Sequence, residues 1–526
     1  MSKQITVTVK TERNKNERKL LHETGNTLLQ TIREGGIALP SLCDGIGKCG
    51  RCSVRFEGYA PLPTQPDRRA FSPDQLREGF RLACMARPVK DCTVETAFGE
   101  DAGIDVVTAA YVNHMTDDRT EIRLSCDKKM PDSHYGTAEA QGMTGGQTIA
   151  AVDIGTTTIA MELLEPVSGR IVDIYTALNP QRSYGADIIA RIRACNEGRA
   201  DMLRRLVENV LEAGLEQFDK TAEQRKLCKP NTIVIACNTA MGHIFMGYPV
   251  ETLGRSPFLP VTIQTVETQF CGRRTWLAPG ISTFVGGDIV AGLYAAGLCP
   301  EKQQTQAAEE SWLFLDLGTN AEMVMGSGGR IACTAAASGP AFEGGKNSAA
   351  SGSDRIYAIA QFLEQGMIDE TGLLAEPYFE TGIESRVKQT GERFLLTQED
   401  IRNIQTAKAA VRTGISFLME SLGISDCSRI GKVYAAGGFG FYLDESAAIR
   451  TGLLPETFKG KFCAVGNTSL AGAAMIGRLL ALEKDNHISS EEKIFGQLEE
   501  YAQEAEVFNL AEKDGFQQRY LSFINF

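Results

Sequence analysis

The chain has 526 residues, of which 43% are hydrophobic and 23% charged, and its formal net charge is −12. This length and composition predict a soluble protein of two or more domains, and the acidic balance excludes sequence-independent binding to nucleic acid, which needs a basic surface. No apolar stretch approaches the roughly 20 residues that span a bilayer, and the start lacks a signal-peptide core, so we expect a cytoplasmic protein without membrane contact.

The first hundred residues predict a small domain of short strands and helices. Alternating apolar residues predict a strand over residues 4–9, a short helix follows over 27–32, and residues 52–56 and 92–95 read as further strands. Between these strands, Ser72-Pro73-Asp74-Gln75 is typical of a helix start, with Ser as the N-cap, Pro at the first helical position and Gln at the third.

Four cysteines in this domain follow a metal-cluster spacing. Cys43, Cys49 and Cys52 form a C-x5-C-x2-C pattern, and Cys84 follows after a gap of 31 residues. Four thiolates so spaced, with glycines between them, favour a [2Fe–2S] cluster held mainly by one loop. Zinc sites usually pair two C-x2-C units and disulfide frameworks belong to small secreted domains, so these two alternatives are less favoured.

Residues 1–97 as a whole resemble a ferredoxin domain. Five residues separate Cys43 from Cys49, whereas the plant-type pattern has four residues between its first two cysteines. This spacing resembles that of the adrenodoxin-like branch. The resemblance implies an α+β, β-grasp fold that carries one electron at a time between proteins. Residues 98–146 are weakly patterned, and we expect a linker or small connecting subdomain there.

From residue 147 the chain changes to an α/β pattern that occurs twice. Residues 149–172 and 312–332 each contain a buried strand ending in Asp-x-Gly-Thr, a second strand and a third strand that begins with Gly-Arg-Ile. One such turn is weak evidence, because ordinary hairpins use the same residues, but two copies in matching contexts are strong. Glycine allows close approach of the backbone, while threonine hydroxyls and amides can donate to phosphate oxygens.

The duplicated pattern resembles the actin, sugar-kinase and Hsp70 ATPases, whose fold is ribonuclease H-like. The resemblance implies an ATPase over 147–484, in two repeats of about 147–310 and 311–484, that binds Mg-ATP between the two turns. Strand-like residues 433–436 lead into a glycine turn that would lie against adenosine, and no Walker A box is present. The expected catalytic residues are Asp153 and Asp316, and the expected nucleotide-binding residues are Gly155, Thr156, Thr157, Thr158, Gly318, Thr319, Asn320, Gly437 and Gly438.

Several further runs have unusual composition without an assigned role. They include Asn179-Pro180-Gln181 with Gly185-Ala186-Asp187, the helix start at Asn238, Gly286-Gly287-Asp288, and Ser338 to Gly344. Thr397 to Asp400 is predicted to cap a long amphipathic helix over 401–422. Residues 485–526 are acidic and helical, and we expect this tail to pack on the ATPase.

The pairing of these two domains, together with the motifs N-P-Q-x3-G-A-D, D-L-G-T-N-A-E, G-P-A-F-E-G and A-G-G-F-G, resembles the reductive activators of corrinoid proteins. The resemblance implies an ATP-dependent reduction of Co(II) to Co(I) on the corrinoid protein of an anaerobic methyltransferase system. The implied partners are that protein and a low-potential electron donor, and a homodimer is one state that the resemblance allows. No cysteine follows Cys463, so we expect no additional C-terminal cluster.

Two other functions compete with this interpretation. A 2-hydroxyacyl-CoA dehydratase activator also couples an actin-like ATPase to electron transfer, but its [4Fe–4S] cluster bridges two short subunits, whereas the four cysteines here are self-sufficient. A kinase-like enzyme with a redox-sensing ferredoxin domain would need a small-substrate pocket, and the sequence identifies none.

Overall fold

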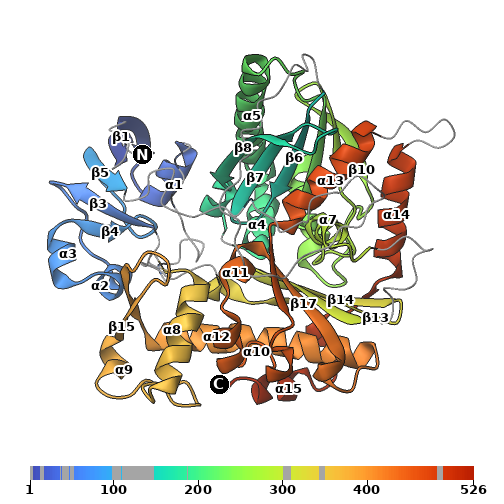
Figure 1. Cartoon of the computed structure of the whole chain (residues 1–526). Coiled ribbons are helices and arrows are strands. Elements are labelled where there is room, and N and C mark those ends of the chain that lie inside the picture. The colour runs from blue at the N-terminus through green and yellow to red at the C-terminus, as the bar shows by residue number, and fades with distance from the viewer. Residues whose placement is uncertain are drawn as a thin grey trace.

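The structure is a computed structural model of the whole chain (Figure 1). The N-terminal domain and the two lobes of the C-terminal part are each built around one sheet. The predicted linker over 98–146 lies outside the described residues, apart from residue 108. The structure describes residues 4–11, 17–35, 37, 39, 47, 52–96, 108, 147–185, 187–299, 310–342, 350–482 and 490–526.

The N-terminal domain is a five-stranded sheet with the strand order β2-β1-β5-β3-β4. The first strand, β1, pairs in parallel with the last strand, β5, at the centre of the sheet. Side chains of β1 and of the first helix pack into one core. The capped helix predicted at Ser72 is confirmed, because Ser72 and Gln75 form a capping box. The elements are β1 (Gln4–Thr11), β2 (Glu17–Glu23), β3 (Ser53–Glu57), β4 (Phe80–Leu82), β5 (Cys92–Thr96), α1 (Leu28–Glu34), α2 (Gln65–Ala70) and α3 (Pro73–Arg77).

The first lobe contains a six-stranded sheet with the order β10-β11-β9-β6-β7-β8. Strands β6, β7 and β8 form an antiparallel meander, and β9 and β11 add to β6 in parallel. The strands are β6 (Ile149–Ile154), β7 (Thr158–Leu164), β8 (Ile171–Leu178), β9 (Thr232–Cys237), β10 (Val266–Phe270) and β11 (Arg273–Leu277). The helices are α4 (Ile188–Ala194), α5 (Ala200–Gln224), α6 (Thr239–Met246) and α7 (Gly287–Ala295).

The second lobe repeats this arrangement with the sheet order β18-β17-β12-β13-β14-β19. Its strands are β12 (Ser311–Leu317), β13 (Asn320–Ser327), β14 (Arg330–Ala337), β17 (Ile430–Ala436), β18 (Phe462–Gly466) and β19 (Glu506–Val507), beside the hairpin β15 (Ile383–Arg386) and β16 (Arg393–Leu396). Its helices are α8 (Gly352–Glu364), α9 (Tyr378–Thr381), α10 (Gln398–Ser421), α11 (Gly437–Tyr442), α12 (Glu445–Arg450), α13 (Thr468–Leu482), α14 (Ser490–Glu504) and α15 (Phe516–Ser522).

The predicted internal repeat is confirmed at the level of topology. In both lobes an antiparallel meander is extended in parallel, by β9 and β11 in the first lobe and by β17 and β18 in the second. The predicted cap of α10 is also confirmed, since Thr397 and Asp400 form a capping box. The glycine turn predicted after β17 is different: Gly437 and Gly438 are the first residues of α11.

Helices α7 and α13 cross so closely between the lobes that no side chain fits at the crossing. A Cβ atom on Gly472 of α13 would overlap the carbonyl oxygen of Ala291 in α7. A Cβ atom on Gly292 would lie 2.9 Å from the Thr468 hydroxyl and 3.2 Å from the Phe314 ring. Because α13 also packs on β6, β9 and β7, a helix that leaves the second-lobe sheet covers the sheet of the first lobe.

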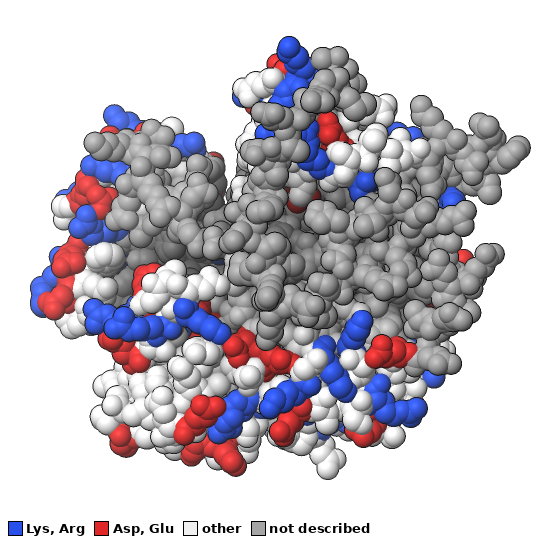
Figure 2. Space-filling model, viewed as in Figure 1, with Lys and Arg blue, Asp and Glu red and all other residues white. Residues whose placement is uncertain are grey.

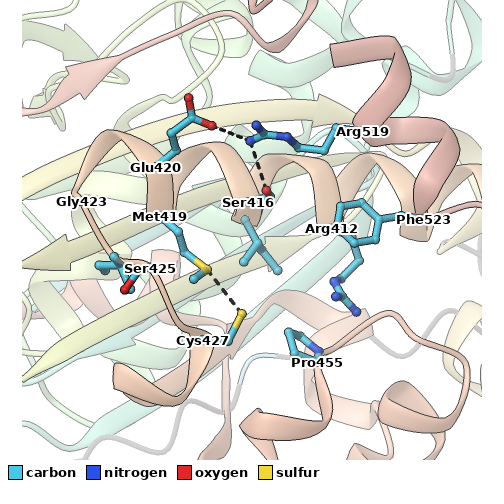
Figure 3. Close-up of a pocket in the computed structure, with 12 residues that line it drawn as sticks. Arg412, Ser416, Met419, Glu420, Gly423, Ser425, Cys427, Pro455, Arg519 and Phe523 are labelled. Carbon is cyan, nitrogen blue, oxygen red and sulfur yellow. Dashed lines mark hydrogen bonds and ion pairs between the residues drawn. The ribbon is translucent and has the colours of Figure 1, made fainter. Parts of the chain in front are cut away.

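The last 37 residues contact both lobes. The ring of Phe495 in α14 stacks on Trp276 of the first lobe, and β19 pairs with β14 of the second. Figure 3 shows Arg519 of α15 paired with Glu420 and hydrogen-bonded to Ser416 of α10, beside a pocket of about 600 Å³. The tail therefore packs on both lobes, with α14 against the first and β19 and α15 against the second.

Charged side chains of both signs are interspersed on the visible described surface (Figure 2). That face shows no extended basic area among the residues drawn in colour, in keeping with the acidic net charge. Among the residues that the structure places, no helix has the length and apolar character needed to cross a bilayer.

The α7–α13 crossing predicts a strong effect of Gly472→Val. Overpacking in a core costs about 1–3 kcal/mol, and here the obstacle is backbone that cannot rotate away, so we expect the thermal midpoint to fall by about 5 °C or more. Gly496→Ala in α14 is the matched control, because a Cβ atom there would meet nothing within 4 Å. Calorimetry of both variants checks this, and equal midpoints would contradict the tight crossing.

Candidate functional site

The residues predicted to bind nucleotide converge at the carboxyl ends of the central strands of the two lobes. Asp153 lies near the end of β6 and Asp316 near the end of β12. The register is the same in both sheets, because Asp153 pairs with Ala236 of β9 and Asp316 with Ala436 of β17. Open α/β sheets bind ligands at such carboxyl ends, so the two turns occupy equivalent, ligand-facing positions.

Asp153 is held by two side chains of the second half of the chain. Asn467 Nδ2 donates to Oδ2 at 2.9 Å, and Ser469 Oγ donates to Oδ1 at 3.1 Å. Both donors belong to the start of α13. Burial raises the pKa of Asp153 to about 6, and the two hydrogen bonds oppose that rise. The aspartate of the first turn is therefore also an interlobe contact.

The N-P-Q motif, which had no assigned role, fixes the backbone of the first turn. Asn179 Nδ2 donates to the Gly155 carbonyl at 2.8 Å, and the Asn179 amide donates to the Thr157 carbonyl at 2.9 Å. The buried guanidinium of Arg191 donates to the Thr156 carbonyl between them. Three successive carbonyl groups are thus tied, so the turn has one defined conformation.

The side chain of Thr156 connects this turn to the next strand. Asn238 Nδ2 donates to Thr156 Oγ1 at 3.2 Å, while Asn238 Oδ1 caps α6 by accepting from the Met241 amide at 2.9 Å. Gly286 lies against the same asparagine, since a Cβ atom there would be 2.5 Å from Asn238 Cα. The starts of α6 and α7 therefore meet beside the first turn. Thr158 is the first residue of β7.

The second turn is fixed by a shorter set of contacts. The Gly318 amide donates to the Asn320 carbonyl at 2.8 Å, and Ser338 Oγ donates to the Gly318 carbonyl at 3.0 Å. Thr319 is buried at 8% exposure, and Asn320 begins β13. Ser338 thus holds a carbonyl of the second turn as Asn179 does in the first.

Gly437 is placed directly against the aspartate of the second turn. Its φ is +75°, a conformation that side chains disfavour, and a Cβ atom there would lie 2.6 Å from Asp316 Oδ1. Burial and the charge of Asp153 raise the pKa of Asp316 to about 7. The glycine is required at this position by both its backbone angle and its contact.

Two carboxylates that were not among the predicted site residues also lie here. Glu322 stands opposite Asp316 in the register of β12 and β13. Burial and the nearby charges of Asp288 and Asp316 raise the pKa of Glu322, and burial with the charges of Asp316 and Asp153 raises the pKa of Asp288 to about 7. Four carboxylates therefore share one region of negative potential.

These four residues each remain partly exposed, so they are not sealed in the core. Within the described parts of the chain, no three His, Cys, Asp or Glu side chains are close enough to bind a metal ion directly. The region between the two turns offers separated carboxylate oxygens as acceptors and backbone amides as donors, which is suited to a hydrated cation and phosphate groups.

The cysteine site is described in part. Cys52 and Cys84 are both buried in the core of the N-terminal domain, and the Ala83 amide donates to the Cys52 carbonyl at 2.8 Å. Gly47 has a φ of +77°, and a Cβ atom there would lie 2.9 Å from Pro66. The structure thus brings the two described cysteines together; Cys43 and Cys49 lie outside the described residues.

Family models match three segments that together cover most of the chain. The model for a 2Fe-2S iron-sulfur cluster binding domain matches residues 11–89, "RACo middle region" matches 149–301, and "C-terminal domain of RACo the ASKHA domain" matches 310–350 and 346–526. The fold and the site thus define a [2Fe–2S] ferredoxin joined to an actin-like, nucleotide-binding ASKHA domain. Within that class, the chain belongs to the RACo family of reductive activators.

Individual relatives agree with this assignment. The corrinoid activation enzyme RamQ of Eubacterium limosum is 28% identical, and the match covers 84% of this chain and 88% of RamQ. A component of the Na(+)-translocating NADH-quinone reductase of Chlamydia pneumoniae is 41% identical over 73 residues, which are 14% of this chain and 17% of that component. A solved reductive activator for corrinoid,iron-sulfur protein shares the fold, with a TM-score of 0.61, 21% identity and coverage of 99% of this chain and 98% of that one.

The contact between Gly437 and Asp316 predicts that Gly437→Ala abolishes ATP turnover. The added methyl group displaces the carboxylate, and the positive φ adds strain of order 1 kcal/mol. Gly423→Ala is the control, because Gly423 has a similar φ of +69° but no neighbour within 4 Å of the added Cβ. We expect both variants to lose similar stability and only Gly437→Ala to lose turnover. Turnover retained in Gly437→Ala would remove this glycine from the site.

Proposed function

We propose that this protein uses ATP hydrolysis to drive one-electron reduction of a corrinoid protein from Co(II) to Co(I), within a methyltransferase system of anaerobic metabolism. One observation carries the proposal: an iron–sulfur domain and a two-lobed ASKHA fold share a chain, and the start of α13 is hydrogen-bonded to Asp153 of the first Asp-x-Gly-Thr turn. The likeness to RamQ over most of both chains supports the corrinoid protein as the partner.

The energetics explain why an electron carrier would be coupled to an ATPase. Clusters of the plant type have potentials near −400 mV. For one electron, each further 100 mV uphill costs about 2.3 kcal/mol. Cobalt takes one electron from the reduced ferredoxin domain, and ATP is hydrolysed to ADP and phosphate. ATP hydrolysis would supply the free energy, and nucleotide-dependent closure of the lobes would couple it to electron transfer by favouring the reduced partner.

The proposed roles divide between the N-terminal domain, which would carry the electron, and the two lobes, which would bind the nucleotide. A [2Fe–2S] cluster bound by the four cysteines would accept and donate single electrons. Buried Cys52 and Cys84 fit such a group, because both lie in one small core. The proposed cluster ligands are Cys43, Cys49, Cys52 and Cys84.

In the cleft, Asp153 and Asp316 would act on a hydrated Mg²⁺ ion that accompanies the nucleotide, since Mg²⁺ keeps several water ligands in most protein sites. Asp288 and Glu322 would add acceptors for those waters beside Asp316. The amides and hydroxyls of the turns would donate to phosphate, and the start of α11 would border adenosine. The proposed nucleotide contacts are Gly155, Thr156, Thr157, Thr158, Gly318, Thr319, Asn320, Gly437 and Gly438.

We further propose the domain limits 1–97, 98–146, 147–484 and 485–526, a low-potential donor protein, a location in the cytoplasm, and a homodimer as a candidate assembly. The matches to RACo models and RamQ favour corrinoid activation over a 2-hydroxyacyl-CoA dehydratase activator or a kinase-like enzyme. A kinase would phosphorylate a metabolite whether or not a corrinoid protein were present.

The cluster assignment predicts the metal content. Anaerobically purified protein is expected to contain two irons and two sulfides per chain, with the reduced-state paramagnetic resonance signal of one [2Fe–2S] cluster. Cys49→Ala should lose that cluster. Zinc in place of iron, or a full cluster in the variant, would contradict the ligand set.

The activator function predicts that low-potential reductant and Mg-ATP together convert the corrinoid protein to its Co(I) form, followed by cobalamin absorbance. Two variants should stop this reaction for different reasons. Cys84→Ala should spare nucleotide binding but lose electron transfer, whereas Asp316→Ala should spare reduction of the cluster but lose ATP turnover. Each activity is measured separately in both variants.

The wild-type chain without ATP is the control. Cobalt reduction at the same rate and to the same extent without ATP would defeat the activator proposal. ATP turnover that survives both Asp153→Ala and Asp316→Ala would show that the repeat is only structural.

A further inference from the structure

Helix α13 is the direct link between the two lobes at the nucleotide cleft. It follows β18, the last strand that extends the parallel part of the second sheet, after Gly466 with a φ of +73°. It then packs on β6 and β9 of the first lobe, where a Cβ atom on Gly477 would lie 2.6 Å from Ile149. Residues 466–469 are therefore the point at which the chain passes from one lobe to the other.

Two side chains at this passage bind the first phosphate turn. Asn467 has two roles, because its Oδ1 accepts from the Leu470 amide at 2.9 Å while its Nδ2 donates to Asp153 at 2.9 Å. Ser469 donates to the other oxygen of the same carboxylate at 3.1 Å. Asp153 thus has both oxygens engaged by the passage, across 314 and 316 positions of sequence.

The equivalent region of the other crossing helix has the opposite chemistry. The start of α7 bears Asp288, whose carboxylate is close enough to Asp316 and Asp153 for their charges to act on it. One turn therefore meets hydrogen-bond donors from α13, whereas the other meets a carboxylate from α7. The first turn is thus attached to the start of α13 by two hydrogen bonds.

We propose that Asn467 and Ser469 are positioning residues that couple the occupancy of the first phosphate turn to the angle between the lobes. The inference rests on the proposed function, because it assumes that nucleotide binds at this turn. The hydrated cation that accompanies the phosphate groups competes with Asn467 and Ser469 for the oxygens of Asp153. Both donors lie at the start of α13. Any change in their hydrogen bonds therefore shifts residues 466–469, which connect β18 to α13, and moves the second lobe.

The tight α7–α13 crossing makes this coupling stiff. Thr468, between the two donors, lies against Gly292 of α7, and the two helices leave no space at Gly472. Packed interfaces tend to switch between discrete arrangements rather than deform continuously. A small displacement at Asp153 is therefore passed on as rotation of a whole lobe.

The test separates the donor role of Asn467 from its capping role. Asn467→Ser keeps an N-cap acceptor, since serine caps about as well as asparagine, but has no amide to donate to Asp153. Ser469→Ala removes the second donor. The double variant is compared with wild type by small-angle scattering, with and without Mg²⁺ and a non-hydrolysable ATP analogue, and by the steady-state kinetics of ATP turnover.

We expect the analogue to reduce the radius of gyration of the wild-type chain and to produce less than half of that change in the double variant. Loss of a hydrogen bond to a charged group lowers a rate or equilibrium constant by roughly tenfold or more. We therefore expect kcat to fall about tenfold, while KM for ATP changes less than about threefold. A purely structural role would instead lower the thermal midpoint and leave closure and kcat of the folded protein unchanged.

Asn509→Ser is the matched control, because Asn509 also accepts from a helical amide, that of Ala511, and donates to a carboxylate, that of Glu512. The radius of gyration of this variant should fall with the analogue as in wild type, and its kcat for ATP should be unchanged. Full closure in the double variant would overturn the inference, as would full closure in Asn467→Asp, which keeps the cap and replaces the donor by a repelling carboxylate. If the wild-type protein binds no ATP, the proposed function itself fails. The wild-type measurement alone shows this, so it is distinguished from a failure of the coupling.

Discussion

The crossing of α7 and α13 brings backbone against backbone at Gly472 and Ala291, so the two lobes share a core instead of meeting across a hinge of loops. The sheet of the first lobe is covered by α13 from the other half of the chain, and Phe314 of the second sheet lies against Gly292 of α7. The position of the two Asp-x-Gly-Thr turns depends on this contact, because the strands that end in them are packed against these helices. A change in the crossing therefore changes the position of the two turns relative to each other.

The two turns are similar in topology but differ in electrostatics. The first has its carbonyl groups tied by Asn179 and Arg191 and its aspartate bound by two donors. The second has Gly437 against its aspartate and two further carboxylates near it. A cation would be drawn to the second turn, where negative charge is concentrated and fewer donors oppose it. The duplicated fold is thus used asymmetrically.

Local patterns in the sequence were sufficient for the strands, the capped helices and the two Asp-x-Gly-Thr turns, because each depends on residues a few positions apart. Glu322 could have been found, since it and Asp316 are equidistant from Thr319 and a tight hairpin must pair them. Asn467 and Ser469 could not, because their contacts with Asp153 span more than 300 residues and carry no local signal. Gly437 was predicted in a turn, but the same backbone angle begins a helix.

The order of the elements along the chain has a consequence for biosynthesis. The ferredoxin domain has its own core and precedes the two lobes, whereas the first lobe is covered by α13 and α14, which are translated long after β6 and β9. Domains generally fold as units, the N-terminal one first. The apolar face of β6 and β9 thus stays uncovered on the ribosome until α13, which begins at Thr468, has emerged, a period in which a chaperone would have a surface to bind. Iron–sulfur assembly factors, by contrast, would meet a folded domain early.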